Sequence, residues 1–175
     1  MIDPQAKPGP YIKLMALVVV LGLISALVTF AFMALVHQGT SLVWEQIAEV
    51  SGLDPRLFTL LVCSLGGLLV GLLVKLFGDH NAIFADLMIE FGKTGRFDYR
   101  AAPGIVITAF VSLISGASLG PEAPLADASG GIGTWISDRL KLDEKETRAM
   151  GYSGVSGMLA SFITEPFSGA LLGLE

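Results

Sequence analysis

The stretch Met15–Val36, MALVVVLGLISALVTFAFMALV, runs for 22 residues without a charged side chain. A helix of this length, rising about 1.5 Å per residue, crosses a hydrocarbon core of about 30 Å. The 175-residue chain is 53% hydrophobic with a mean hydropathy of +0.69, so it is far more apolar than a typical soluble domain. These features predict a membrane protein. A secretory signal peptide is the alternative, but its apolar region usually covers about 7 to 15 residues.

Two long helices are expected in the first half of the chain. Tyr11–Val36 forms the first, and Leu57–Val74 is a second charge-free run of 18 residues. Between them, the mixed segment His37–Arg56 predicts a surface helix and a turn, with Trp44 placed as an interfacial aromatic residue. Lys7 and Lys13 precede the first helix and favour a cytoplasmic N-terminus.

After Lys75 the apolar segments become too short to span a bilayer. Four short helices are expected, at Ala82–Phe91, Gly104–Leu119, Pro124–Ser137 and Ala149–Thr164, and the final piece PFSGALLGLE begins another. Broken helices occur in membranes only where protein or a water-lined cavity satisfies their backbone, and transporters use them to place helix ends near the midplane. The sequence therefore predicts an all-α, multi-pass membrane bundle that contains broken or re-entrant half-helices.

Small residues support close helix packing in this bundle. Gly67 and Gly71 form a G-x-x-x-G pattern, and SGGIG at 129–133 and SGVSG at 153–157 offer further surfaces for close approach. Ordinary helix packing is a sufficient explanation for any one of these patterns.

The remaining composition excludes several classes of function. The net charge of −5 shows no basic stripe, so nucleic acid is not an expected partner. The single Cys63 can form no internal disulfide. His37 and His80 are isolated and fit an interface or a helix end better than a metal site. Neither a metal nor a cofactor is expected.

The stretch GASLGPEAPL, residues 116–125, places the carboxylate of Glu122 inside a very apolar region. Gly120 and Pro121 interrupt the preceding helix, and Pro124 suits the first turn of the next one. Glu122 then lies at a helix N-terminus, where free N–H groups and the helix dipole attract anions. A capping glutamate at a membrane surface, worth about 0.3–1 kcal/mol, is the structural alternative. Because an intramembrane carboxylate is costly, we expect Glu122 to be functional.

Two stretches, SGASLGPEAPLADASGGIGTWI and TRAMGYSGVSGMLASFITEPFSGALLGLE, resemble the middle of the first half of the CLC chloride channel and transporter family. That family has a glycine-x-glutamate-glycine-proline signature, a glycine-rich helix, and then a small-residue helix that ends at a proline break. The resemblance is continuous from about Gly104 to Glu175 and weaker upstream. The SLGPEAP variant is most similar to a divergent bacterial branch of ion-transport proteins.

The resemblance implies that Glu122 is the gating glutamate, which blocks the outer anion site and carries the proton in transporters. Gly120, Pro121, Ala123 and Pro124 would form its anion-binding loop. Pro121 replaces the family's usual basic residue and Ala123 its usual glycine, which alters the flexibility and the local field of the loop.

An upstream turn of the family contributes a serine to the central anion site. Asn81, within HNAIF, falls where this serine would be, and its amide could donate a hydrogen bond to an anion. The glycines and proline of the family's turn are missing here, so a plain helix cap by Asn81 is an equal alternative.

A CLC subunit contains two inverted halves, and the resemblance covers only the first. We therefore expect residues 1–175 to be the N-terminal half of a longer chain; a natural half-length subunit that assembles with itself or with a partner is the alternative. The family's inner proton-transfer glutamate would lie at or just beyond Glu175. The resemblance implies a homodimer in the cell membrane that transports small inorganic anions, as a channel or in exchange for protons. It implies no enzymatic activity.

The alternative function is that of an intramembrane serine protease. GYSG, residues 151–154, matches the G-x-S-G pattern of rhomboid serine proteases, in which the serine pairs with a later histidine. Both histidines of this chain precede Ser153, and Val155 breaks the G-x-S-x-G form. Helix packing explains Ser153 and Ser156 better.

Overall fold

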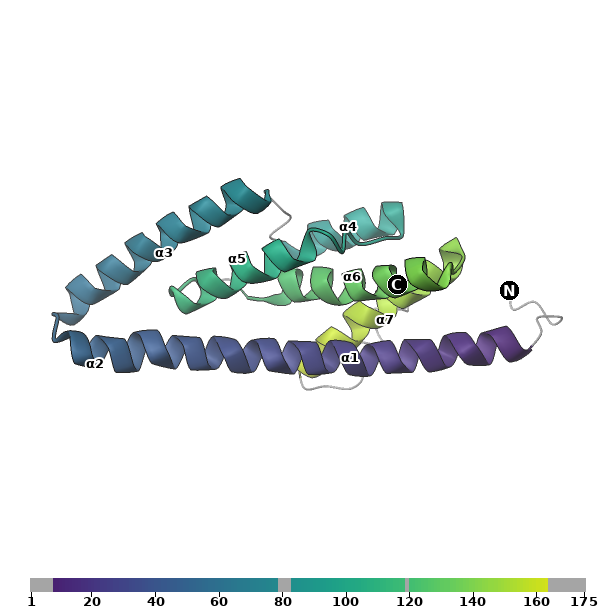
Figure 1. The fold of residues 1–175 in the computed structure, drawn as a ribbon, viewed down its shortest axis with the longest axis horizontal. Coiled ribbons are helices and arrows are strands. Elements are labelled where there is room, and N and C mark those ends of the chain that lie inside the picture. The colour runs from purple at the N-terminus through teal and green to yellow at the C-terminus, as the bar shows by residue number, and fades with distance from the viewer. Residues whose placement is uncertain (1–7, 79–82, 119, 164–175) are drawn as a thin grey trace.

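A computed structural model describes residues 8–78, 83–118 and 120–163, and every regular element in these ranges is helical (Figure 1). The elements are α1 (Pro8–Ser41), the π-helix η1 (Leu42–Ile47), α2 (Ala48–Ser51), α3 (Pro55–Phe77), α4 (Phe84–Thr94), α5 (Ala102–Ile114), α6 (Glu122–Leu140) and α7 (Glu144–Ile163). The expected all-helical architecture is confirmed for the described residues.

The first long helix extends much further than predicted. Residues 12–51 form one continuous apolar rod of 40 residues, in which η1 and α2 prolong α1. The prediction of a separate surface helix after Val36 was therefore wrong. Only Gly52, which adopts a left-handed φ of 61°, ends the rod.

The second long helix, α3, agrees with its prediction. The Asp54 side chain caps its start by accepting a hydrogen bond from the Arg56 N–H at 2.9 Å, and Pro55 occupies the first turn. Among the described residues, α3 and the first rod are the two helices long and apolar enough to cross a membrane. Large apolar side chains on both are exposed, including Phe30 at 71% and Leu68 at 72%. This surface suits lipid better than water.

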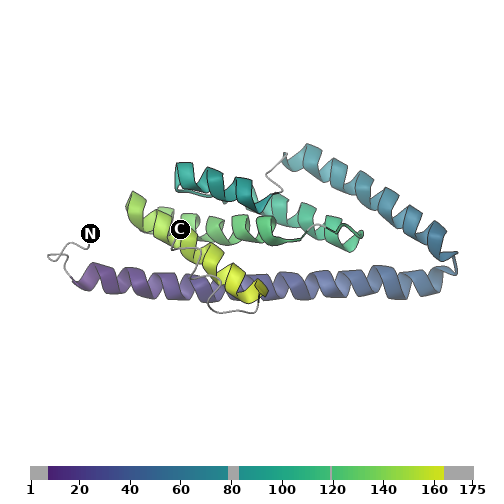
Figure 2. The ribbon, with the colours of Figure 1, turned by 180° about the vertical axis from the view of Figure 1, so that it is seen from behind.

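The four shorter helices fold over the middle of the rod. Figure 1 shows α4 and α6 running toward the end of the bundle where α1 begins, while α5 and α7 run back, and Figure 2 shows the same order from behind. The last predicted helix, at the PFSGALLGLE segment, lies outside the described residues.

Small residues allow α1, α6 and α7 to pack closely. A Cβ at Gly133 would lie 2.6 Å from the Met150 carbonyl oxygen, and one at Gly157 would lie 2.6 Å from the Gly22 carbonyl oxygen. The SGGIG and SGVSG patterns therefore bring helix backbones together, as predicted. Neither Gly67 nor Gly71 has a described atom within 4 Å of its would-be Cβ, so their G-x-x-x-G pattern makes no contact within the described residues.

The apolar core holds α4 against α6 and α7. The rings of Phe91 and Phe97 stack with centroids 4.3 Å apart, and both pack with Leu125, Val155 and Met158. This core fixes the position of α6, and with it the position of Glu122 at the N-terminus of α6.

Candidate functional site

The segment between α5 and α6 begins where α5 ends at Ile114, and this helix C-terminus has a regular capping structure. Gly116 takes a positive φ of 99°, its N–H donates to the Leu113 carbonyl, and the Ala117 N–H donates to the Ser112 carbonyl at 3.1 Å. This pair of bonds is a Schellman motif, which terminates a helix and turns the chain. The run predicted as helical to residue 119 therefore stops at Ile114, because the glycine conformation satisfies the last carbonyls outside the helix.

Two other helices hold the end of α5 in place. The indole Nε1–H of Trp44 donates to the Ile114 carbonyl oxygen at 2.9 Å, and its ring packs edge-on against Phe58. Gly66 on α3 faces the Ser115 side chain so closely that no Cβ would fit between them. Trp44 is therefore a half-buried clamp, because its indole hydrogen bond holds the end of α5.

The helix α6 begins at Glu122, with Pro124 in its first turn as the sequence indicated. Pro121 is the N-cap residue and its side chain is buried, and the first backbone bond runs from the Leu125 N–H to the Pro121 carbonyl at 3.0 Å. The N–H groups of Glu122 and Ala123 precede this bond, so the helix offers them no acceptor. They form the positive end of α6.

The carboxylate of Glu122 folds back over the preceding loop. A Cβ added to Gly120 would overlap both carboxylate oxygens, so the carboxylate lies directly against the Gly120 backbone. The Glu122 side chain is half-buried, whereas Ala123 beside it is only 3% exposed. A glycine at 120 is therefore needed for this position of the carboxylate.

The geometry brings together five of the predicted site residues, Gly120, Pro121, Glu122, Ala123 and Pro124, in one turn at the start of α6. Asn81, the sixth, lies outside the described residues, as does Glu175. The helix that follows Asn81 starts at Phe84, two residues later than predicted, and Ile83 is its N-cap.

Asp127, for which the sequence predicted no role, lines a polar cavity of about 150 Å³ between α4, the α4–α5 loop and α6. Glu90, Arg96 and Asp98 share this lining, and Asp127 is only 9% exposed. Asp127 is the one charged residue between Ala123 and Ser137. A single carboxylate in such an apolar run is the sequence feature that indicates a possible functional role for Asp127.

Ser153, the candidate nucleophile of the protease alternative, has a packing role. Its hydroxyl donates to the Val18 carbonyl of α1 at 2.8 Å, and Ser161, two turns later, likewise donates to the Ala26 carbonyl. Both hydroxyls join α7 to α1, which agrees with the helix-packing interpretation.

The fold and this site define a helical membrane protein with two long apolar helices and an interrupted pair, α5 and α6, that carries a carboxylate at the break. The chain belongs to the voltage gated chloride channel family, whose sequence profile matches residues 66–175. Members of this family transport ions, and membership agrees with the membrane location that the two apolar helices indicate.

The chain is also similar to curated bacterial proteins. It is 26% identical over 163 residues to proteins named "Putative ion-transport protein YfeO" from Escherichia coli O139:H28, Escherichia coli K12 and Shigella boydii serotype 18. The match covers 91% of this chain but only 38% of each relative, so the chain spans well under half of their length. No solved structure matches the chain.

Proposed function

We propose that this protein conducts small, chloride-like inorganic anions across the cell membrane and that Glu122 gates their path. The observation that carries the proposal is the half-buried carboxylate of Glu122, folded back over Gly120 at the positive end of α6. Membership of the voltage gated chloride channel family supports the class of substrate.

The proposed mechanism is a competition for one helix end. An arriving anion interacts with the free N–H groups of Glu122 and Ala123 and with the dipole of α6. The Glu122 carboxylate is tethered beside the same N–H groups and repels the anion while it is charged. Protonation removes that charge, so the anion enters as the side chain leaves.

Two modes of transport are compatible with this competition. In a channel, the Glu122 side chain moves aside and anions flow down their gradient. In an exchanger, Glu122 carries a proton across in the opposite direction during each cycle. The proposal includes both, and the response of proton movement to a Glu122 variant separates them.

We also propose that residues 1–175 form the N-terminal half of the transporting domain and that the complete protein acts as a homodimer. The coverage of only 38% of each curated relative supports a longer functional polypeptide. A second set of helix ends from the partner half would then complete the anion path that the start of α6 begins.

The test is anion efflux from liposomes that contain the native full-length polypeptide, with proton movement recorded at the same time. Glu122→Gln keeps the shape of the side chain and mimics the protonated acid. We expect it to raise anion flux, or to leave anion flux while abolishing coupled proton movement. Glu144→Gln is the matched control, because Glu144 is exposed at the start of α7, at the other end of α6.

Each outcome has a defined meaning. Loss of coupled proton movement in Glu122→Gln alone identifies an exchanger, and raised flux without proton movement identifies a channel. If correctly folded Glu122→Gln protein transports anions and protons as the wild type does, the gating role is wrong. If the wild type transports no small anion at all, the proposed function itself is wrong.

A further inference from the structure

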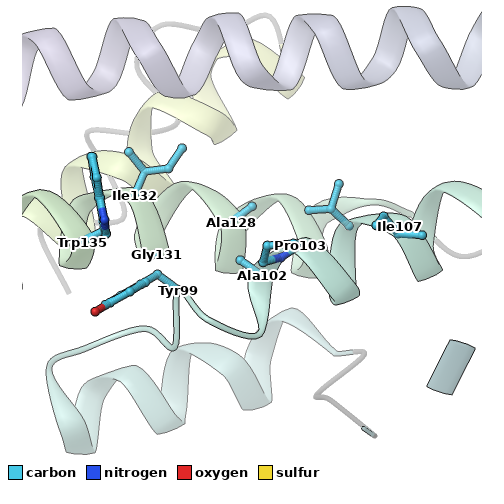
Figure 3. Close-up of a pocket in the computed structure, with 9 residues that line it drawn as sticks. Tyr99, Ala102, Pro103, Ile107, Ala128, Gly131, Ile132 and Trp135 are labelled. Atoms are coloured by element: carbon cyan, nitrogen blue, oxygen red, sulfur yellow. The ribbon is translucent and has the colours of Figure 1, made fainter. Parts of the chain in front are cut away.

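An apolar groove of about 550 Å³ lies along the contact between α5 and α6, away from Glu122 (Figure 3). Its walls come from both helices, with Ala102, Val106 and Ile107 on α5 and Ala128, Ile132 and Trp135 on α6. Ile107 and Trp135 are 46% and 44% exposed. The groove is therefore open to whatever surrounds the bundle, and its walls are almost entirely hydrocarbon.

The two aromatic residues of the groove gather at one end. Figure 3 shows Tyr99 and Trp135 together at the C-terminal side of α6, with Ile107 at the far end and the Tyr99 hydroxyl pointing away from Ala102. Gly131 permits this arrangement, because its would-be Cβ lies only 3.2 Å from the Tyr99 Cα. Tyrosine and tryptophan at one end of an apolar surface are typical of the level of the lipid headgroups.

A cation lies at the same end. The guanidinium carbon of Arg139 is 5.4 Å from the centroid of the Trp135 ring, which places the charge beside this end of the groove. Within the described part of the chain, no ion pair joins Arg139 to a carboxylate, whereas the nearby Asp138 is paired with Arg96. The Arg139 charge is thus available to an anionic partner.

Basic residues lie in the surrounding loops together with carboxylates. The α4–α5 loop carries Arg96 and Arg100 beside Asp98, and Lys141 follows α6 ahead of Asp143. Figure 1 shows that α4 and α6 both end at the side of the bundle where α1 begins. Basic residues at one end of a membrane bundle favour the cytoplasmic face, where the leaflet is rich in anionic lipids.

We propose that this groove is a binding site for an anionic phospholipid. One acyl chain lies along the α5–α6 walls, and the headgroup phosphate lies against Arg139 at the aromatic end. Apolar walls that end at a tryptophan, a tyrosine and an arginine match the order of parts in such a lipid, which has a hydrocarbon chain, an interfacial region and an anionic headgroup. The inference is independent of the role of Glu122.

The test uses the fluorescence of Trp135 in the native full-length polypeptide. The protein is reconstituted in phosphatidylcholine vesicles that contain increasing mole fractions of phosphatidylglycerol with brominated acyl chains, which quench a tryptophan on contact. Brominated phosphatidylcholine is the second titrant. Subtracting the signal of Trp135→Phe isolates the contribution of Trp135 from that of Trp44 and any other tryptophan.

Phosphatidylglycerol should reach half-maximal quenching of Trp135 at about a fivefold lower mole fraction than phosphatidylcholine, as expected for one basic residue near the surface. Arg139→Gln should remove this difference. Ala102→Phe, which fills the groove with a ring, should also remove it, while Arg56→Gln, at the exposed start of α3, should leave it unchanged.

Three results would overturn the proposal. Equal quenching by the two brominated lipids in the wild type would mean that Trp135 touches only bulk lipid. No quenching by either would mean that protein, such as another part of the polypeptide or a second copy, covers the groove. A preference for phosphatidylglycerol that survives in Arg139→Gln would mean that the headgroup is held elsewhere.

Discussion

Replacing Gly120 with alanine tests the position of the proposed gate, Glu122, without changing the chemistry of its carboxylate. The added methyl group would occupy the space in which both carboxylate oxygens of Glu122 now lie. The obstructing atoms are the far end of a flexible side chain, so the carboxylate can move while the loop keeps its shape. Gly120→Ala should therefore displace the Glu122 carboxylate from the Gly120 backbone while the rest of the protein keeps its structure.

The size of the effect follows from what the carboxylate loses. A carboxylate beside a helix N-terminus gains about 0.3–1 kcal/mol from the helix dipole and the free N–H groups. Losing this advantage weakens Glu122 as a competitor, so the apparent affinity for the transported anion should rise by roughly two- to fivefold. The change should have the same direction as that of Glu122→Gln.

The assay is the dependence of liposome efflux on anion concentration, compared between the wild type and Gly120→Ala. Gly71→Ala is the control, because no described atom lies within 4 Å of the methyl group it adds. If Gly120→Ala protein shows the wild-type anion dependence while Glu122→Gln changes it, the carboxylate does not act from its place over Gly120. That result would refute the proposed competition at the start of α6.

Three further results are expected. Gly154→Ala should lower the free energy of unfolding by about 1–3 kcal/mol in thermal unfolding, because its methyl group would overlap the α6 backbone. Gly67→Ala places its methyl group in open space and should have little effect, so equal effects of the two variants would contradict the described packing. Trp44→Phe keeps a ring but removes the N–H that donates to the last carbonyl of α5, so it should lower the free energy of unfolding by about 0.5–1.5 kcal/mol. An unchanged unfolding temperature would mean that this hydrogen bond does not hold the end of α5. A membrane-impermeant thiol reagent should label Val50→Cys in intact cells but Lys145→Cys only after lysis, because the loops near Lys145 contain the arginine and lysine residues that favour the cytoplasmic side. The reverse labelling pattern would mean that the protein has the opposite orientation in the membrane.

The helices of this protein were predictable where the sequence pattern is long and uniform. Leu57–Val74 lies wholly within α3, and the short apolar runs after Lys75 correspond to α4, α5, α6 and α7. The start of α6 was predictable from proline, which suits the first turn of a helix, whereas α5 ends five residues earlier than predicted because Gly116 terminates it. Glu122 was placed at the start of α6 on this basis alone.

The segment after Val36 was predicted wrongly because its polarity suggested a surface. Its mixed composition does not stop a helix, and no residue between Val36 and Gly52 has a left-handed φ. The half-buried ring of Trp44 then finds its partners at the end of α5, which lies 70 residues away along the chain. Local patterns carry no information about such a contact, so Trp44 could not be recognised as a clamp.

The sequence by itself determined that the chain is helical, that it belongs in a membrane, and that a carboxylate sits at a helix start within an apolar region. These properties depend on hydropathy, on helix length and on backbone rules that act over a few residues. Only the tertiary structure decided that the carboxylate lies against Gly120, that Asp127 lines a polar cavity, and that Tyr99 and Trp135 end one groove. Each of these requires side chains from different turns or helices to meet, and that meeting is set by how α4, α5, α6 and α7 pack together.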